Sequence, residues 1–176
     1  MANILTINDL KASLRGGAKT DKYLIEIGTP VGSPDLAFTK DDIVLVHASS
    51  FPARNIGLMN AWVQGRLLKI PGDSSFEETW NITAYQTPDH SGRKKFIKWM
   101  DKIDTYIDNF HTSVPNDFMV QIRAKQLDQD GNITAEYLLH NCFPTNVGEI
   151  ELDSKTPNEL QSYSVQFTYS HWEISV

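Results

Sequence analysis

The last third of the chain alternates apolar and polar residues, and this pattern constrains the fold more than any other feature of the sequence. One set of alternate positions is apolar or aromatic and comprises Tyr163, Val165, Phe167 and Tyr169. The positions between them are polar and comprise Ser162, Ser164, Gln166, Thr168 and Ser170. Because successive side chains of a strand point to opposite faces, a period of two indicates a strand with one buried face. The sequence therefore predicts one long strand here, with Tyr163, Val165 and Phe167 in the core.

The segment before this strand, residues 141–152, is rich in residues that favour turns. Proline fixes its own φ angle, and asparagine and glycine tolerate left-handed backbone geometry. Pro144, Asn146 and Gly148 occupy alternate positions of this segment. We therefore expect an irregular, turn-rich connection that leads into the strand.

Composition limits the classes of protein that the chain can belong to. Its 176 residues are 40% apolar and 22% charged, which suits one folded domain over residues 1–176. The net charge of −6 disfavours a protein that binds nucleic acid by neutralising phosphates. The sequence shows neither a secretion signal nor an apolar run of membrane-spanning length, so we expect no association with a membrane.

Two element types are predicted near the N-terminus. A short amphipathic helix begins at the capping-box pair Thr6 and Asp9 and ends at Gly16-Gly17. Its apolar positions are Ile7, Leu10 and Leu14. Two strands are predicted after it, at residues 22–27 and 43–46.

Two hairpins and one larger helix are predicted in the middle of the chain. Strands at residues 61–70 and 80–85 flank the turn-forming segment 71–75, and a second hairpin spans residues 118–139 around an Asp-Gly turn. The helix lies within residues 91–109. Its apolar face comprises Phe96, Trp99, Met100, Ile103 and Ile107. We expect Trp80, Phe96 and Trp99 to lie in the core.

Residues 49–58 begin and end with turn formers but also contain Phe51, Ile56 and Leu58. A fully solvated loop rarely carries such residues, so another surface should cover this segment. The covering surface is either the same domain or a neighbouring copy of the chain.

No residue pattern predicts catalysis or metal binding. The chain has no Gly-x-Ser-x-Gly motif, and its histidines are scattered singly. Residues 128–132 resemble the start of a calcium loop, but the glycine comes too early and position 139 is Leu139 instead of glutamate. The lone Cys142 suits a small buried hydrophobe. A chance cluster of His140, Glu136 and Cys142 is the remaining enzyme hypothesis, and we predict no enzyme activity, cofactor or metal.

A set of short motifs runs through nearly the whole chain. The C-terminal set is Pro144-Thr145-Asn146-Val147-Gly148-Glu149, then Leu152, then Asn158-Glu159-Leu160-Gln161, then Trp172-Glu173. The earlier set is Gly16-Gly17, Tyr23 to Ile27, Phe51-Pro52-x-x-x-Ile56, Gly72-Asp73-x-x-Phe76 before Trp80, and Lys95-Phe96-x-x-Trp99. In order, spacing and identity, these motifs resemble the tail tube proteins of contractile-tailed, myovirus-type bacteriophages.

The resemblance implies a mainly β fold, an antiparallel β-sandwich or barrel of two packed sheets with one flanking α-helix and a short N-terminal helix. It implies hexameric rings that stack into a hollow tube inside a contractile sheath. The implied partners are the sheath protein, a baseplate or hub initiator, the tape measure protein and the tail terminator. DNA would pass through the lumen without specific binding, and the protein would belong to the virion tail after assembly in the host bacterial cytoplasm.

The resemblance also suggests where copies of the chain meet. Candidate contacts between rings are Phe51, Pro52, Arg54, Ile56, Leu58, Asp73 and Phe76, followed by the N-terminal helix. The candidate inter-subunit or structural signature is Pro144, Asn146, Gly148 and Glu149. One face of the predicted hairpins would line the lumen, and their basic residues, Arg66, Lys69, Arg123 and Lys125, either face away from it or pair with acids.

Two alternatives stay open. One is a tube of the same architecture in a type VI secretion system or a phage-derived injection machine, in which the lumen carries protein effectors. The other, from a different class, is a monomeric β-sandwich enzyme or ligand-binding protein.

Overall fold

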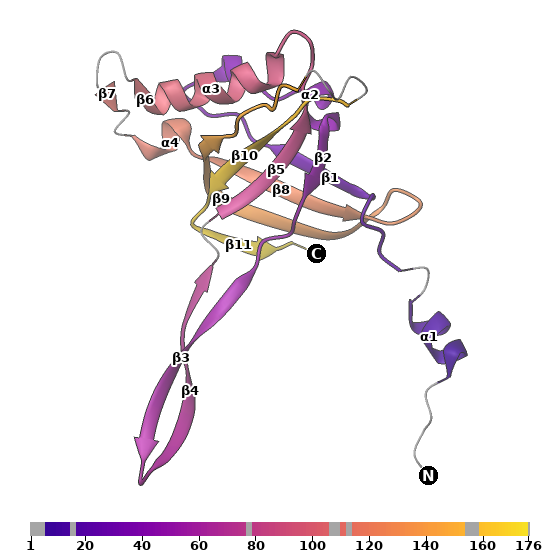
Figure 1. The fold of residues 1–176 in the computed structure, drawn as a ribbon, viewed down its shortest axis with the longest axis vertical. Coiled ribbons are helices and arrows are strands. Elements are labelled where there is room, and N and C mark those ends of the chain that lie inside the picture. The colour runs from indigo at the N-terminus through magenta and orange to yellow at the C-terminus, as the bar shows by residue number, and fades with distance from the viewer. Residues whose placement is uncertain are drawn as a thin grey trace.

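The computed structural model describes residues 6–14, 17–76, 79–105, 110–111, 114–153 and 159–175. The helices are α1 Ile7–Leu14, α2 Lys40–Val44, α3 Ser91–Ile103 and α4 Pro115–Phe118, with a 3-10 helix at Pro34–Leu36. The strands are β1 Tyr23–Ile27, β2 Val46–Ser49, β3 Arg54–Val63, β4 Arg66–Phe76, β5 Thr79–Tyr85, β6 Asp104–Thr105, β7 Phe110–His111, β8 Val120–Leu127, β9 Ile133–Val147, β10 Ser162–Thr168 and β11 His171–Ile174. Figure 1 shows a body of curved sheet and helices from which a long hairpin and α1 extend.

A seven-stranded antiparallel sheet forms the body, in the order β1-β8-β9-β10-β5-β2, with β11 paired to β9. The long strand β9 belongs to both halves of this sheet, because its first part pairs with β8 and β11 and its last part pairs with β10. The two outer strands approach each other where the Tyr23 hydroxyl of β1 donates a hydrogen bond to the Val46 carbonyl of β2, at 3.0 Å. The sheet is therefore strongly curved, and its inner side encloses the core.

The core lies between this inner side and α3. Phe167 of β10 is fully buried, and its ring lies 5.8 Å from Trp80, 5.9 Å from Phe96 and 6.2 Å from Trp99. Tyr163 and Val165 on the same strand are also buried. The residues predicted to lie in the core are thus buried together; they are Trp80, Phe96, Trp99, Tyr163, Val165 and Phe167.

Several sequence predictions are confirmed. Helix α1 begins at the predicted capping box, since the Asp9 carboxylate accepts hydrogen bonds from the backbone N–H and the hydroxyl of Thr6, at 2.8 and 2.7 Å. Strand β1, helix α3 and the β8–β9 hairpin also form where they were expected. The carboxylate of Asp128 holds the hairpin turn by accepting the backbone N–H groups of Asp130 and Asn132, both at 2.8 Å. Gly16, Ile107 and Asn158 lie outside the described residues.

The predicted strand at residues 43–46 is wrong. Residues Lys40–Val44 form α2 instead, and strand β2 begins only at Val46. A local signal explains the difference, because both the backbone N–H and the hydroxyl of Thr39 donate to the Asp42 carboxylate at 2.8 Å. Such a pair at the start of a helix satisfies donors that would otherwise have no partner.

The first predicted hairpin is also wrong, because the chain reverses within residues 61–70. Gln64 and Gly65 form the turn, with φ angles of 48° and 79°. Positive φ at both central residues is the geometry of a two-residue hairpin turn. Strand β3 therefore pairs with β4, and Gly72 and Asp73 lie within β4 instead of forming a turn.

The predicted connection at residues 141–152 is wrong in its first half, because β9 continues through Val147. The irregularity is confined to Asn141, which has a φ of 56°, and to a register shift where Pro144 faces Phe167. The final strand is also divided, since β10 ends at Thr168 and β11 then pairs with another part of β9. Among the described residues, no helix combines the length and apolar character that crossing a membrane requires.

Candidate assembly surfaces

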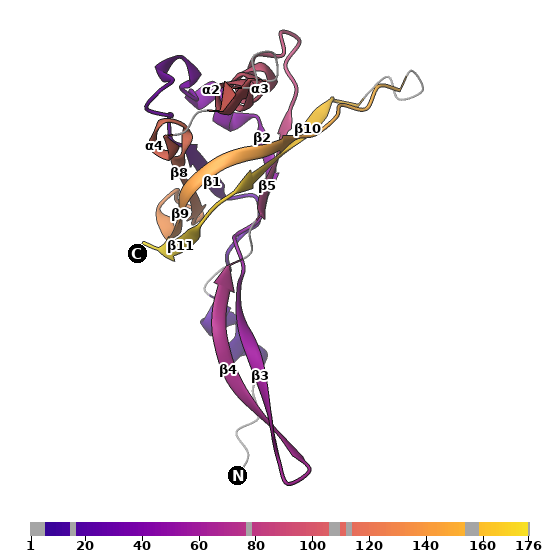
Figure 2. The same ribbon diagram turned by 90° about the vertical axis from the view of Figure 1, so that its left-hand side faces the viewer.

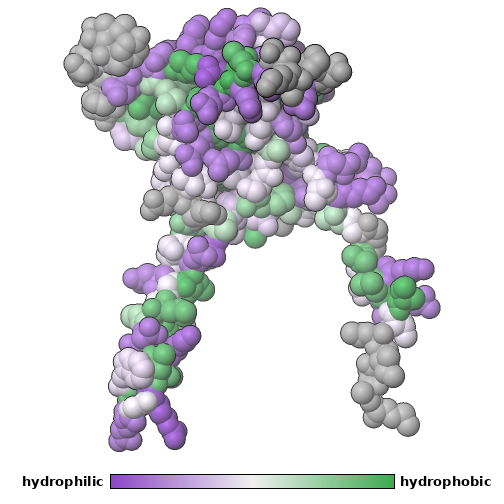
Figure 3. Space-filling model, viewed as in Figure 1, coloured by the Kyte–Doolittle hydropathy of each residue, from purple (hydrophilic) through white to green (hydrophobic). Residues whose placement is uncertain are grey.

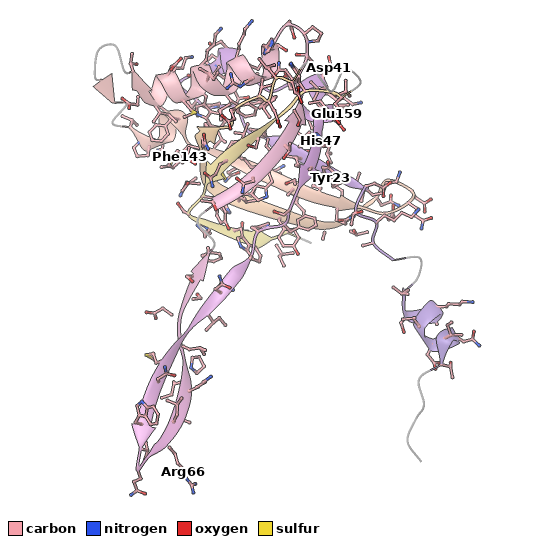
Figure 4. All side chains as sticks on the ribbon, viewed as in Figure 1. Tyr23, Asp41, His47, Arg66, Phe143 and Glu159 are labelled. Atoms are coloured by element: carbon pink, nitrogen blue, oxygen red, sulfur yellow. The ribbon has the colours of Figure 1, made fainter. Side chains whose placement is uncertain are left out.

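Strands β3 and β4 form a two-stranded hairpin that we call the arm. The arm extends away from the body, and its tip carries Arg66 (Figures 1, 2 and 4). Its strands pair with each other and with no other strand of the described chain. An isolated two-stranded hairpin has only marginal stability in water, so this element needs further contacts.

Both faces of the arm carry apolar side chains. The register places Leu58, Trp62, Leu67 and Pro71 on one face, with Asn60 and Lys69 between them. The other face carries Met59, Ala61, Val63, Leu68 and Ile70, with Arg66 at the tip. Trp62 is 71% exposed and Leu58 is 66% exposed, although such side chains are usually buried. Figure 3 shows apolar surface along the arm on the side that faces the viewer.

The predicted inter-ring contact residues divide between two places. Ile56, Leu58 and Asp73 lie along the arm, whereas the other four lie at its root, where it joins the body. These four are Phe51, Pro52, Arg54 and Phe76. Pro52 is buried, and the ring of Phe51 stacks on Tyr137 of the body at 4.5 Å. The predicted loop at residues 49–58 is therefore an anchored segment followed by the first half of a strand.

Helix α1 is the second element with an unpartnered apolar face. Its Ile7, Leu10 and Leu14 are all more than half exposed, and the helix buries none of its residues. Figures 1 and 3 show that α1 and the arm extend from the same end of the body, some way apart. Within the residues that the structure describes, the apolar face of α1 is therefore left uncovered.

The signature residues have structural partners inside the chain. Pro144 is buried beside Phe167, where a residue without a backbone N–H fits the shifted register. Gly148 donates its backbone N–H to the Ser164 carbonyl at 2.7 Å and accepts a hydrogen bond from the Arg93 guanidinium at 3.2 Å. Asn146 and Glu149 are exposed. A role of these residues between subunits stays a prediction.

The basic residues of β8 are paired with acids on the outer side of the sheet. Lys125 contacts Glu26 at 2.7 Å, and Arg123 lies 3.6 Å from Glu136 and 4.0 Å from Glu26. These carboxylates offset the positive charge of β8. The other two basic residues, Arg66 and Lys69, lie on the arm.

The three residues of the enzyme hypothesis have separate partners. Cys142 is fully buried, and burial raises the pKa of its thiol to about 12. Glu136 pairs with Arg123, and His140 lies 3.1 Å from Glu173. Within the described ranges, no group of three or more histidine, cysteine or acidic residues could hold a metal ion. This arrangement provides no reactive thiolate at neutral pH.

Sequence reasoning missed most of the arm. Most of the exposed apolar residues of the arm were assigned to an ordinary strand of the body at residues 61–70; they are Trp62, Val63, Leu67, Leu68 and Ile70. One signal could have revealed them. Apolar residues at both odd and even positions of residues 56–70 do not fit a strand with one buried face and one wet face.

Comparison with protein families gives one match over most of the chain. The family described as "Phage tail tube protein" matches residues 18–175. Helix α1 lies before the matched residues.

Similar proteins from known phages carry the same description. The tail tube protein gp19 of Enterobacteria phage T4 is 26% identical over 127 residues, which cover 72% of this chain and 77% of that protein. The tail tube protein of Serratia phage KSP90 is 23% identical over 167 residues, which cover 93% and 94% of the two chains.

Solved structures share the fold at low sequence identity. A chain in the anti-feeding prophage baseplate aligns with a TM-score of 0.66 and 10% identity, covering 90% of this chain and 95% of that one. A chain in the sheath–tube complex of the extracellular contractile injection system PVC, in its extended state, aligns with a TM-score of 0.60 and 14% identity, covering 98% and 99%. The expected fold class is confirmed by this likeness and by the antiparallel strands. The family match over residues 18–175 confirms the resemblance seen in the motifs: the chain belongs to the phage tail tube protein family and is a structural component of the virion tail.

Proposed function

We propose that the chain is the repeating subunit of a contractile phage tail tube. Six copies close into a ring, and rings stack into a hollow conduit for genome delivery inside a contractile sheath. The tube begins at a baseplate or hub, encloses the tape measure protein and ends at a terminator. The subunit acts by assembly and not by catalysis. The single observation that carries this proposal is the arm, whose two faces are both apolar and exposed.

An apolar face is stabilised only when another surface covers it. Monomeric proteins rarely expose contiguous apolar patches of more than a few hundred Å². A ribbon with one apolar face could lie against its own body, but this arm extends away from the body and is apolar on both faces (Figure 2). Insertion among neighbouring copies removes both faces from water. The arm is therefore the main contact between rings.

Helix α1 contributes a second contact between copies. It extends from the same end of the body as the arm, and its apolar face is exposed in the described part of the chain (Figure 1). The exposed residues of the signature, Asn146 and Glu149, contribute to contacts within the ring.

Charge on the body suits a lumen through which DNA moves without being held. Arg123 and Lys125 are paired with Glu26 and Glu136, so the outer side of β8 presents no unpaired positive charge to a phosphate backbone. The net charge of −6 likewise disfavours attraction between the protein and DNA. Attraction repeated at every ring would slow a moving polyanion.

The test introduces one charge on each face of the arm. Leu58→Asp and Met59→Asp replace side chains that are more than half exposed, so the monomer should keep its melting temperature. An unpaired charge buried in a contact costs several kcal/mol, and about 3 kcal/mol raises the critical concentration for tube growth about 100-fold. Electron microscopy over a concentration series measures tube growth.

Ile133→Asp is the matched control. It makes the same chemical change at an exposed apolar residue in β9, away from the arm. We expect tubes from the control at the concentration that the parent needs, and none from the arm variants. Normal tubes from both arm variants would refute the role of the arm. Discrete monomers of the parent at every concentration would refute the proposal that the chain is a tube subunit.

The alternative, a tube of an injection machine that carries protein effectors, has less support. It is favoured only by the fold likeness to chains of the anti-feeding prophage and PVC assemblies. The phage relatives are more similar in sequence, at 23–26% identity.

A further inference from the structure

An aromatic cluster joins the root of the arm to the body. Its rings come from four places in the chain: Phe51 before β3, Phe76 at the end of β4, Tyr137 of β9 and Trp172 of β11. Trp172 contacts two of the other rings. Its ring centre is 5.4 Å from that of Tyr137 and 6.0 Å from that of Phe76.

Trp172 contacts the chain at both ends of the arm, directly before β3 begins and where β4 ends. Its indole Nε1 donates a hydrogen bond to the Ala53 carbonyl at 3.2 Å, and Ala53 directly precedes β3. Its ring meets Phe76, the last residue of β4, at an interplanar angle of 78°. Such an edge-on arrangement is one of the favoured geometries of aromatic pairs. One side chain of the C-terminal strand thus fixes the place where the arm begins and the place where it ends.

Further contacts hold the root of the arm, some from the body and one from the arm itself. On the body side, Phe51 stacks on Tyr137 at 4.5 Å, and the buried Trp80 donates its Nε1–H to the Ser50 carbonyl at 2.6 Å. On the arm side, the guanidinium of Arg54 lies 5.5 Å from the centre of the Phe76 ring, which is a cation–π contact. The entry strand is therefore anchored just before the arm begins.

The direction of the arm depends on this root. In the part of the chain that the structure describes, the arm meets the body only there (Figures 1 and 2). Strand β3 has 10 residues. At about 3.3 Å per residue, the arm is roughly 30 Å long, and a swing of about 10° at the root moves its tip by roughly 5 Å. A tip displaced by that distance misses the surface that it must enter.

We propose that Trp172 is the positioning residue of the arm: from the C-terminal strand it holds both arm strands against the body and sets the direction in which the arm leaves. This inference rests on the proposed role of the arm as a contact between copies. By presetting the arm, Trp172 lowers the entropy that is lost when the arm enters a neighbouring copy.

The experiment measures arm direction and assembly separately. Spin labels on Arg66→Cys at the arm tip and Gln129→Cys in the β8–β9 turn report the distance between arm and body by pulsed electron paramagnetic resonance. The native Cys142 stays unlabelled because it is buried. Unassembled protein, at a concentration below that of tube growth, gives the distance distribution. Electron microscopy gives the concentration at which tubes form.

Trp172→Ala should broaden the distance distribution and raise the critical concentration about tenfold or more. Trp172→Phe keeps a ring against Phe76 and Tyr137. It should therefore keep a distance distribution and a critical concentration close to those of the parent. Phe76→Ala removes the same ring contact from the arm side and should broaden the distribution as well, so the test remains decisive if Trp172→Ala does not fold. Trp62→Ala is the matched control: it removes an exposed tryptophan of the arm, and should impair tube growth without changing the distribution.

Two results separate the positioning role from the proposed contact. A distribution in Trp172→Ala or Phe76→Ala as narrow as in the parent, and centred at the same distance, would overturn the positioning role. A broadened distribution together with tubes at the parent concentration would support the positioning role and overturn the arm as a required contact.

Discussion

Replacement of Gly148 by alanine tests why the signature contains a glycine. Its φ angle is not in the left-handed region, so the backbone conformation itself permits other residues. The constraint is space. A Cβ at this position would lie 2.5 Å from the Ser164 hydroxyl oxygen and 3.2 Å from the Ser164 carbonyl oxygen. The residue therefore allows two strands to approach closely, and does not make a turn.

The expected cost follows from two opposing effects. Overfilling a close-packed site costs about 1–3 kcal/mol, and replacing glycine by alanine recovers about 0.4–1 kcal/mol by restricting the unfolded chain. Taken at mid-range, the two effects leave a net destabilisation of Gly148→Ala of about 1–2 kcal/mol. For a protein of this size, it lowers the melting temperature by about 2–8 °C.

Thermal unfolding of a double-mutant cycle measures the cause. Ser164→Ala removes the hydroxyl, which is the nearest atom, and leaves the carbonyl oxygen at 3.2 Å as the nearest remaining contact. Gly148→Ala should consequently cost about 1 kcal/mol less in the Ser164→Ala background than in the parent. An equal cost in both backgrounds, or a rise in melting temperature, would show that crowding against Ser164 is not the reason for the glycine.

Two further predictions concern side chains of the body. Cys142 should resist a thiol reagent such as DTNB at pH 8 in the folded protein and react fully in denaturant, because burial raises its pKa to about 12; rapid labelling of folded monomer would contradict its burial. Partial burial opposes ionisation of Asp42, but the Lys95 ammonium at 2.5 Å and hydrogen bonds to the carboxylate outweigh it and hold the pKa of Asp42 below its ordinary value. A lowered pKa of Asp42 gives stability that is present above about pH 4 and is lost as the pH falls through the folded-state pKa. Asp42→Asn should therefore unfold more easily than the parent at pH 7. This difference in stability should shrink toward pH 2. Urea unfolding at pH 7 and pH 2 measures the stability of both proteins. A difference in stability that is the same at the two pH values would contradict the ion pair.

The elements that the sequence predicted correctly are those that local patterns determine. The alternation around Val165 requires a strand with one buried face, and the spacing of Phe96 and Trp99 requires a helix with one buried face. The Asp-Gly turn at Asp130 and Gly131 brings β8 and β9 together through neighbouring residues alone. In each case, the residues that carry the signal also make the contact.

The arm could not be predicted in this way because its turn signals compete. Residues 71–75 have the composition of a turn, yet the structure uses Gln64 and Gly65. Gly72 has a different purpose, because a Cβ there would lie 3.2 Å from the backbone of Gly57 on the opposite strand. Gly57 and Gly72 allow the two strands to approach closely at a register shift. This requirement becomes visible only when the pairing of β3 with β4 is known.

The apolar side chains of residues 49–58 led to the expectation of a covering surface, although the structure predicted for this segment was incorrect. Phe51, Ile56 and Leu58 indicated that another surface, of the same domain or of a neighbouring copy, covers residues 49–58, and this expectation did not depend on whether the segment is a loop or a strand. The structure separates these residues, because Phe51 stacks on Tyr137 in the body whereas Ile56 and Leu58 remain exposed. Phe51→Asp would therefore disturb the root as well as any contact, and Leu58 is the better residue for testing the interface.

The position of Trp172 links the arm to the end of the chain. The arm is a two-stranded ribbon without a core of its own, so it is ordered at one end by the root cluster and requires a neighbour to cover its faces. Strand β11, which holds that cluster, pairs only with β9 among the described strands. Loss of β11 should then release the arm while the contacts of β1, β8, β9 and β10 remain. The proposed positioning role of Trp172 therefore predicts that folding of the C-terminal strand is coupled to assembly: a subunit whose last strand has not docked should not present its arm in the direction that tube growth requires.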